Sequence, residues 1–263
     1  MSVAAVIAVE GVAVLQWVAL VAAGVGAGLT GSVAGLASLV SYPALLAVGL
    51  PAVEANVTNT VALVASTVGS VGGSRRELAG RVRPALRLAA AGLAGGAAGS
   101  ALLLVTPPGL FERLVPFLVA LGAVGMLVRG RLVDRGDGEA TTTPAGWSAV
   151  AAVGCIGVYS GYFGAGAGVM LLALLLHVTG ARLPVANALK NLLLGVANST
   201  AACAFAFFGP VRWTTALPLA LGLVAGGATG PAVVRRLPAD RLRIAIGVAG
   251  LGLAVVLAVD VYR

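Results

Sequence analysis

The sequence has very little charge for its length. Only 10% of its 263 residues are Asp, Glu, Lys or Arg, whereas 59% are hydrophobic, and the mean hydropathy is +1.04. Soluble domains carry about 25% charged residues, so a soluble fold of this length would lack the polar surface that it needs. The composition therefore excludes a soluble globular protein and indicates an integral membrane protein.

Residues for metal, redox or hydrolytic chemistry are also scarce. The chain has one His and two Cys, and it contains no P-loop of the pattern GxxxxGK[ST]. Two cysteines specify neither a disulfide framework nor a metal site, and the sequence offers no credible nucleophile paired with a base. It therefore predicts that the protein is not an enzyme and has no catalytic residues, no metal site and no cofactor.

The cationic residues are nearly all arginine. Of the 17 cationic residues 16 are Arg, and the single lysine is Lys190. They cluster between apolar segments, where anionic lipid headgroups meet a membrane protein. The net charge of +8 therefore predicts contact with a lipid bilayer, and it does not indicate nucleic-acid binding.

The apolar residues form about ten segments. Most approach the roughly 20 residues that cross the hydrocarbon core, and they are too uniformly apolar for the alternating strands of a barrel. We therefore expect an all-α integral membrane protein with roughly 8–10 membrane segments. The segments are 3–25, 33–49, 53–72, 85–105, 112–128, 146–162, 167–179, 184–208, 213–234 and 242–259.

An internal repeat links the two halves of the chain. Chance matches of Ala and Gly are common in apolar sequences, but matched Leu-Pro and Ala-Asn pairs in the same order are harder to obtain by chance. We therefore expect a first membrane repeat at 1–133, a cytoplasmic linker at 134–145 and a second repeat at 146–263. A shift of 133 residues aligns Gly28, Gly31, Gly35 and Leu50-Pro51 with Gly161, Gly164, Gly168 and Leu183-Pro184, and a shift of 131 aligns Ala55-Asn56 with Ala186-Asn187.

The charges of the loops predict that the two repeats have inverted topology. Five arginines lie between residues 74 and 87, but the matching loop of the second half carries only Arg212. Conversely, four arginines lie between residues 235 and 243, and their counterpart carries only Arg113. If basic loops are cytoplasmic, the halves have opposite orientations and both termini lie outside. The segments 146–162 and 167–179 then make no net crossing, either as two full spans or as a re-entrant hairpin.

The stretch GVGAGLTG at 24–31 contains a match to the dinucleotide fingerprint GxGxxG. No soluble βαβ unit surrounds it, so cofactor binding is disfavoured. We expect instead that glycine breaks the helix here and again at 161–168, and that the free amides after each break can bind an anion. The alternative is that these glycines only allow close packing or turns.

A polar stripe follows each Leu-Pro pair. The spacing of three and four residues places these side chains on one side of a helix. Two matching stripes favour a polar pathway for a small anionic substrate, although such side chains also link membrane helices structurally. The stripes comprise Asn56, Asn59, Thr60, Thr67 and Ser70 in the first half, and Asn187, Lys190, Asn191 and Asn198 in the second.

Lys190 is the most informative single residue of the stripe. It stands seven positions into an apolar run, where a cation usually faces a partner or a substrate path. The alternative is that its ammonium reaches the near membrane surface. Proton coupling stays open, because His177 stands at a segment end and the sequence shows no obvious intramembrane carboxylate carrier.

Several motifs together resemble the sulfite exporter TauE/SafE family of membrane permeases. The second half carries the most specific ones, and the first copy of the glycine motif, GSVAG at 31–35, is poorer in glycine than GAGAG at 164–168. That difference puts the equivalence of the two half-sites in doubt. The matching stretches are GYFGAGAG at 161–168, LPVANALKN at 183–191, AGGATG and RRLP between 225 and 238, VGLP at 48–51, EANVTNT at 54–60 and SRREL at 74–78.

The resemblance implies a secondary transporter of the cytoplasmic (inner) membrane that exports sulfite or a small organosulfonate by alternating access. It places the substrate site between two homologous halves. A passive anion channel and a non-transporting membrane assembly protein stay as alternatives, and a homodimer is left open. With the stripe included, the candidate substrate-binding residues are Asn56, Asn59, Thr60, Asn187, Lys190 and Asn191, with the backbone at Gly31 and Gly164.

Overall fold

The computed structural model describes residues 3–128, 146–234 and 239–262, and all regular structure in them is helical. The predicted all-α class is therefore confirmed. The predicted linker 134–145 and the arginines at 235 and 236 lie outside the described residues. The first half forms α1 (Val3–Ala34), α2 (Ala37–Ala47), α3 (Ala52–Gly73), α4 (Arg75–Leu78), α5 (Val82–Val105) and α6 (Pro108–Val128). The second half forms α8 (Trp147–Tyr162), α9 (Ala167–Thr179), α10 (Leu183–Phe208), α11 (Trp213–Val234) and α12 (Ala239–Tyr262).

Several helices have the length and composition to cross a bilayer. Within the described residues, such stretches lie at Val14–Ser32, Pro84–Val105, Pro108–Gly125 and Leu183–Phe208, and shorter apolar stretches occur in α2, α9, α11 and α12. Large apolar side chains such as Phe207 and Phe208 face outward from the bundle. An outward apolar surface suits a lipid environment. The backbone N–H and C=O groups, which lipid cannot hydrogen-bond, are satisfied within each helix.

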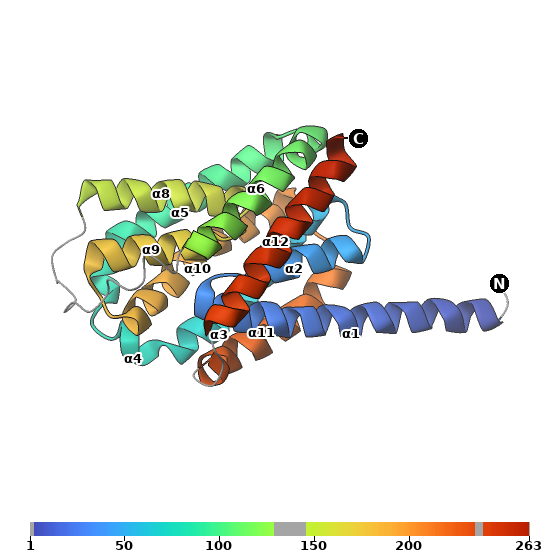
Figure 1. Cartoon of the computed structure of the whole chain (residues 1–263), viewed down its shortest axis with the longest axis horizontal. Helices are drawn as coiled ribbons and strands as arrows, with labels where there is room; N and C mark the ends of the chain where they lie inside the picture. Colours follow the sequence, from blue (N-terminus) through green and yellow to red (C-terminus); the bar gives the residue numbers. More distant parts are fainter. Residues whose placement is uncertain (1–2, 129–145, 235–238, 263) are drawn as a thin grey trace.

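The helices of one half pack mainly on those of the other (Figure 1). α1 lies along α11, and α5 lies along α8. α3 contacts α10 and α11, α10 also contacts α5, and α6 packs against α12. The N-terminal turns of α1 extend past the rest of the bundle (Figure 1).

Glycines form the contact between α1 and α11. A Cβ atom added to Gly24 would lie 2.9 Å from Cα of Gly222, and one added to Gly226 would lie 2.9 Å from the amide nitrogen of Leu29. Small residues spaced by four on membrane helices permit this close backbone approach. Within the fingerprint-like stretch, Gly24 and Gly28 thus serve helix packing.

A second glycine contact of the same kind joins α5 and α8. A Cβ atom on Gly95 would lie 2.9 Å from Cα of Gly157, and one on Gly161 would lie 3.0 Å from Cα of Gly96. In both helix pairs, α1 with α11 and α5 with α8, the first half therefore contacts the second through the backbone of glycine residues.

The break predicted at 24–31 is wrong, because α1 continues without interruption to Ala34. The helix is broken only at Gly35, whose φ is +74°, and Leu36. Glycine does not by itself end a membrane helix. Gly24 and Gly28 stay helical because they pack against α11, as small residues do in membrane helix pairs. The break predicted within 161–168 is confirmed, since residues 163–166 separate α8 from α9.

Gly222→Ala is expected to lower the thermal stability of the purified protein, because the new methyl group overlaps the α1 backbone. Overpacking of this kind costs about 1–3 kcal/mol. Gly252→Ala is the matched control, since no atom lies within 4 Å of a Cβ built there, and it should be neutral or slightly stabilising. Equal melting temperatures for the two variants in detergent would contradict the assigned packing.

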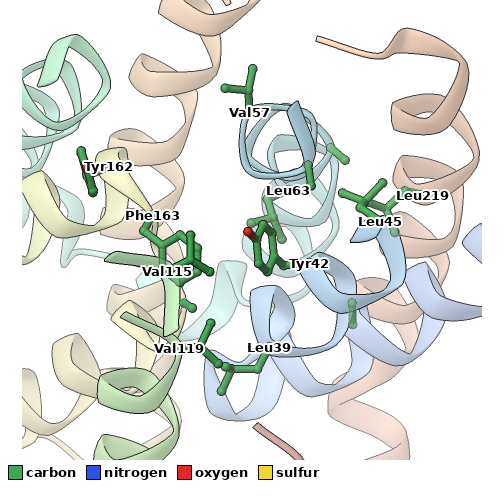
Figure 2. Packing of buried hydrophobic residues seen from close by; sticks show 14 of the residues in the cluster. Leu39, Tyr42, Leu45, Val57, Leu63, Val115, Val119, Tyr162, Phe163 and Leu219 are labelled. Atoms are coloured by element: carbon green, nitrogen blue, oxygen red, sulfur yellow. The ribbon is translucent and has the colours of Figure 1, made fainter. Parts of the chain in front are cut away.

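An aromatic cluster closes one side of the second break. Tyr42 of α2 meets Phe163 edge-on with ring centroids 5.2 Å apart, and Figure 2 shows the two rings beside Val115 and Val119 of α6. Phe111 of α6 packs on Phe163 with centroids 6.0 Å apart. These side chains are buried, so the space between α2, α6 and the α8–α9 break is filled.

The loop between α10 and α11 is tied to the N-terminal turns of α3. The Arg212 Nε donates to Glu54 Oε2 at 2.6 Å, and its backbone amide donates to Thr58 Oγ1 at 3.0 Å. The hydrogen bond to Glu54 raises the pKa of the Arg212 guanidinium above its ordinary value. Both bonds join the second half to the same end of α3.

Candidate functional site

A cavity of about 60 Å³ lies where both helix breaks meet α3 and α10. Because a cavity needs about 10–15 Å³ by this measure to hold one water, the space accommodates several waters or one small solute. Its polar lining is rich in hydroxyl and amide groups, and no acidic or aromatic side chain is among the described residues that line it. These polar residues are Ser32, Ser38, Ser66, Thr67, Ser70, Ser160, Lys190, Asn191 and Asn198.

The two breaks touch each other beside the cavity. A Cβ atom on Gly35 would lie 2.6 Å from Cα of Gly168, so the two backbones are in direct contact. Ala37 and Ser38 of α2 and Ala167 of α9 line the cavity, and they belong to the first turns of those helices. The start of a helix carries a positive partial charge, which favours an anion, although the amide of Ala167 already donates to the carbonyl oxygen of Gly164 at 3.1 Å.

Lys190 supplies a full positive charge at the cavity wall. Its side chain is fully buried, which excludes the alternative that it reaches the membrane surface. The ammonium donates to the carbonyl oxygen of Gly31 at 3.2 Å, near the C-terminal end of α1. The negative end of that helix dipole stabilises the cation, and the same residue forms part of the cavity wall.

The predicted residues Asn187 and Asn191 have different places on α10. Asn191 lines the cavity, whereas Asn187 lies outside the lining and donates from Nδ2 to the carbonyl oxygen of Ser32 at 2.9 Å. Two turns beyond Asn191, Asn198 accepts a hydrogen bond of 2.8 Å from Ser160. Asn187 thus holds the end of α1 next to Lys190, and Asn198 ties α10 to α8.

The three predicted residues of α3 lie outside the cavity lining. Asn56 donates from Nδ2 to the carbonyl oxygen of Tyr162 at 2.8 Å, and Thr60 donates to the carbonyl oxygen of Asn56 at 3.0 Å. Asn59 contacts Ser41 of α2. All three are buried. Asn59 connects α3 with α2 and Asn56 connects it with the end of α8, whereas Thr60 bonds within α3. Of the eight predicted residues, Gly31, Gly164, Lys190 and Asn191 line the cavity.

Four hydroxyl groups of the lining, those of Ser32, Ser38, Ser66 and Ser160, were not predicted from the sequence. Ser66 could have been found, because the stripe on α3 continues at spacings of three and four through Leu63 and Ser66 to Ser70. Ser38 and Ser160 are single hydroxyls within apolar stretches and give no comparable signal. His177 lies outside the cavity and is exposed in the last turn of α9, and proton coupling stays a prediction.

Comparison with known proteins identifies the family. The model of the sulfite exporter TauE/SafE family matches residues 20–257. The chain is 26% identical over 235 residues to the probable membrane transporter protein ORF9 of Sinorhizobium sp, covering 89% of each chain. It is also 26% identical over 210 residues to the probable membrane transporter protein YfcA of Escherichia coli K12, covering 79% of this chain and 77% of the relative.

No solved structure gives a significant match. The family match spans nearly the whole chain, and it confirms the resemblance seen in the motifs at 161–168 and 183–191. The names of the family and of both relatives are those of membrane transporters, which agrees with the apolar helices of the bundle. The chain therefore belongs to the sulfite exporter TauE/SafE family and is a multi-pass membrane transporter.

Proposed function

We propose that the chain is a secondary transporter that exports a small oxyanion, sulfite or a simple organosulfonate, across the cytoplasmic (inner) membrane. The observation that carries the proposal is the fully buried Lys190 at the wall of a cavity lined by hydroxyls and amides. An intramembrane cation usually faces a partner or a substrate path. An anion in the cavity would lie close to the cationic side chain of Lys190, which forms part of the cavity wall.

The lining also favours a class of anion. Because no acidic or aromatic side chain of the described residues lines the cavity, a substrate ammonium would find neither a counter-charge nor a cation–π partner. Sulfite and uncharged-tail sulfonates are therefore favoured over a zwitterion such as taurine. The small volume of the cavity, about 60 Å³, also favours compact anions.

We also propose that the two halves are inverted repeats. Apart from α4, which has no counterpart among the described helices of the second half, the helices occur in the same order in each half, with a short helix second, and the contacts between the halves are reciprocal. Exchange of the halves maps the pair α1–α11 onto α8–α5, and the pair α3–α11 onto α10–α5. The pairs α3–α10 and α6–α12 map onto themselves. This pattern is what two repeats related by a pseudo-two-fold axis would produce.

The position of the cavity supports alternating access. It lies along the second half of α3, from Leu63 to Ser70, and along the first part of α10, from Lys190 to Asn198. Those helix ends adjoin the arginines at 75, 76 and 182, which the positive-inside rule assigns to the cytoplasm. The cavity is then on the cytoplasmic side, while the aromatic cluster at Tyr42 and Phe163 closes the other side. If the two halves exchanged their conformations, the cavity would open on the opposite side of the membrane.

Counterflow in proteoliposomes distinguishes this carrier from the passive channel. Sulfite loaded inside the vesicles is expected to accelerate the entry of labelled sulfite several-fold, because a carrier returns faster with substrate bound than empty. A pore shows no such trans-stimulation. Taurine loaded at the same concentration is the control and should not stimulate entry. Entry that is independent of internal sulfite would contradict the carrier, and equal stimulation by taurine would contradict the assigned substrate class.

A further inference from the structure

The first half of α3 contains buried amide atoms without partners. Asn56 and Asn59 are 1% and 0% exposed, and neither Asn56 Oδ1 nor Asn59 Nδ2 has a hydrogen-bond partner. Buried polar side-chain atoms are nearly always hydrogen-bonded, and each exception needs an explanation, such as a bound ion. The spacing of three residues places the two side chains next to each other on one face of the helix.

The contacts of Ser41 identify the second unpartnered atom as an oxygen. Ser41 Oγ lies 2.9 Å from the carbonyl oxygen of Ala37 and 2.5 Å from the Asn59 amide. Its one proton cannot serve both acceptors. Both contacts become hydrogen bonds if the Asn59 amide is turned over, because Nδ2 then donates to Ser41 and Ser41 donates to Ala37. The amide oxygen of Asn59 then takes the unpartnered position next to Asn56.

The end of α8 brings a third oxygen to this place. Tyr162 is the last residue of α8, and its carbonyl oxygen accepts the Nδ2 of Asn56 at 2.8 Å. The amides of Phe163 and Gly164 both turn back to the carbonyl oxygen of Tyr159, so they do not compensate Tyr162. The last carbonyls of a helix carry a negative partial charge, which favours a cation.

The matching place in the second half already contains a cation. A shift of 131 residues puts Asn187 on Asn56 and Lys190 on Asn59. Asn187 donates to the carbonyl oxygen of Ser32, and the Lys190 ammonium donates to that of Gly31, both near the end of α1. The end of α1 therefore receives the positive charge of a lysine, whereas the equivalent residue at the end of α8 is a neutral amide.

We propose that a sodium ion binds between the amide oxygens of Asn56 and Asn59 and the carbonyl oxygen of Tyr162. The ion would supply at the end of α8 the positive charge that Lys190 supplies at the end of α1. Neutral oxygen atoms suit a hard cation, and the absence of a carboxylate among these three ligands favours a monovalent ion. The C-terminal ends of broken helices coordinate Na⁺ in other secondary transporters. The site does not depend on the identity of the transported anion.

Thermal unfolding of the purified protein in Na⁺ against K⁺, at constant ionic strength and without sulfite, tests the site. The melting temperature should rise by roughly 3–6 °C once Na⁺ reaches ten times its dissociation constant. Asn59→Lys supplies its own cation, as Lys190 does, and should show no Na⁺-specific rise. Thr200→Val on α10 is the control and should keep the full response, because Thr200 bonds only within its own helix.

A second variant keeps the proposal testable if Asn59→Lys fails to fold. Asn59→Asp adds a negative ligand and should lower the half-saturating Na⁺ concentration several-fold, a gain that damage to the fold cannot imitate. No Na⁺-specific shift in the wild type, or an unchanged half-saturating concentration in Asn59→Asp, would overturn the site. Sulfite binding is tested by a different variant, Lys190→Met, and the sodium measurement contains no sulfite. A failure of sulfite to bind would therefore leave the sodium result unaffected.

Discussion

Lys190→Met should abolish sulfite transport while leaving a folded protein in the membrane. Methionine is close to lysine in volume but has no charge, so an anion in the cavity would lose its counter-ion in a low-dielectric environment. Removing one partner of a buried charge pair costs about 2–5 kcal/mol, which lowers the affinity by about 30-fold or more. Uptake by proteoliposomes and the sulfite-induced shift in melting temperature measure the effect.

The control for this variant is Leu194→Met, which changes an uncharged cavity residue one helical turn away and should reduce transport only slightly. Lys190→Arg should retain part of the activity, because the charge stays although the larger guanidinium fills the cavity. A monodisperse Lys190→Met protein that transports sulfite at the wild-type rate would show that the anion does not bind beside this residue.

Gly35→Ala is expected to have the largest effect on folding. The residue has a φ of +74°, a conformation that costs a residue with a Cβ atom about 1–2 kcal/mol. The new Cβ would also lie 2.6 Å from Cα of Gly168, and backbone cannot move away as a flexible side chain can. The two effects act together, so we expect loss of most of the folded, monodisperse protein after extraction in detergent.

Two further variants separate strain from overlap. Gly49→Ala has a φ of +90° but open space around the new Cβ, and Gly168→Ala has the overlap with Gly35 without a left-handed φ. Gly49→Ala should cost only the strain, and Gly168→Ala should come close to the Gly35→Ala result. If Gly35→Ala were no worse than Gly49→Ala, the two helix breaks would not be in contact.

The sequence was sufficient to predict the helical class, which depends on composition, and to single out Lys190, which is a charge within an apolar run and is buried in the bundle. It did not locate the first break. Glycines that pack helices and glycines that end them look alike in the stretch 24–31, and only the partner helix α11 decides between the two roles. Gly222 and Gly226, which supply that partner surface, lie about 200 positions away in the sequence.

The candidate site was predicted in part for a similar reason. The stripes on α3 and α10 identified the two polar helices, but not which turns of each helix face the same cavity. The crossing of the helices selects the later turns of α3, so Ser66 lines the cavity while Asn56 and Asn59 contact neighbouring helices. Ser38 enters the lining only because the break at Gly35 turns the start of α2 towards α10.

The glycine contacts between α1 and α11 and between α5 and α8 determine the smallest unit that can fold. The close-packing face of α1 has its partner in the second half, and that of α5 likewise. A fragment cut within the linker would leave these grooved apolar faces uncovered, so neither fragment is expected to be stable until the other is present. A single half expressed alone is therefore expected to need a second chain to cover its glycine faces.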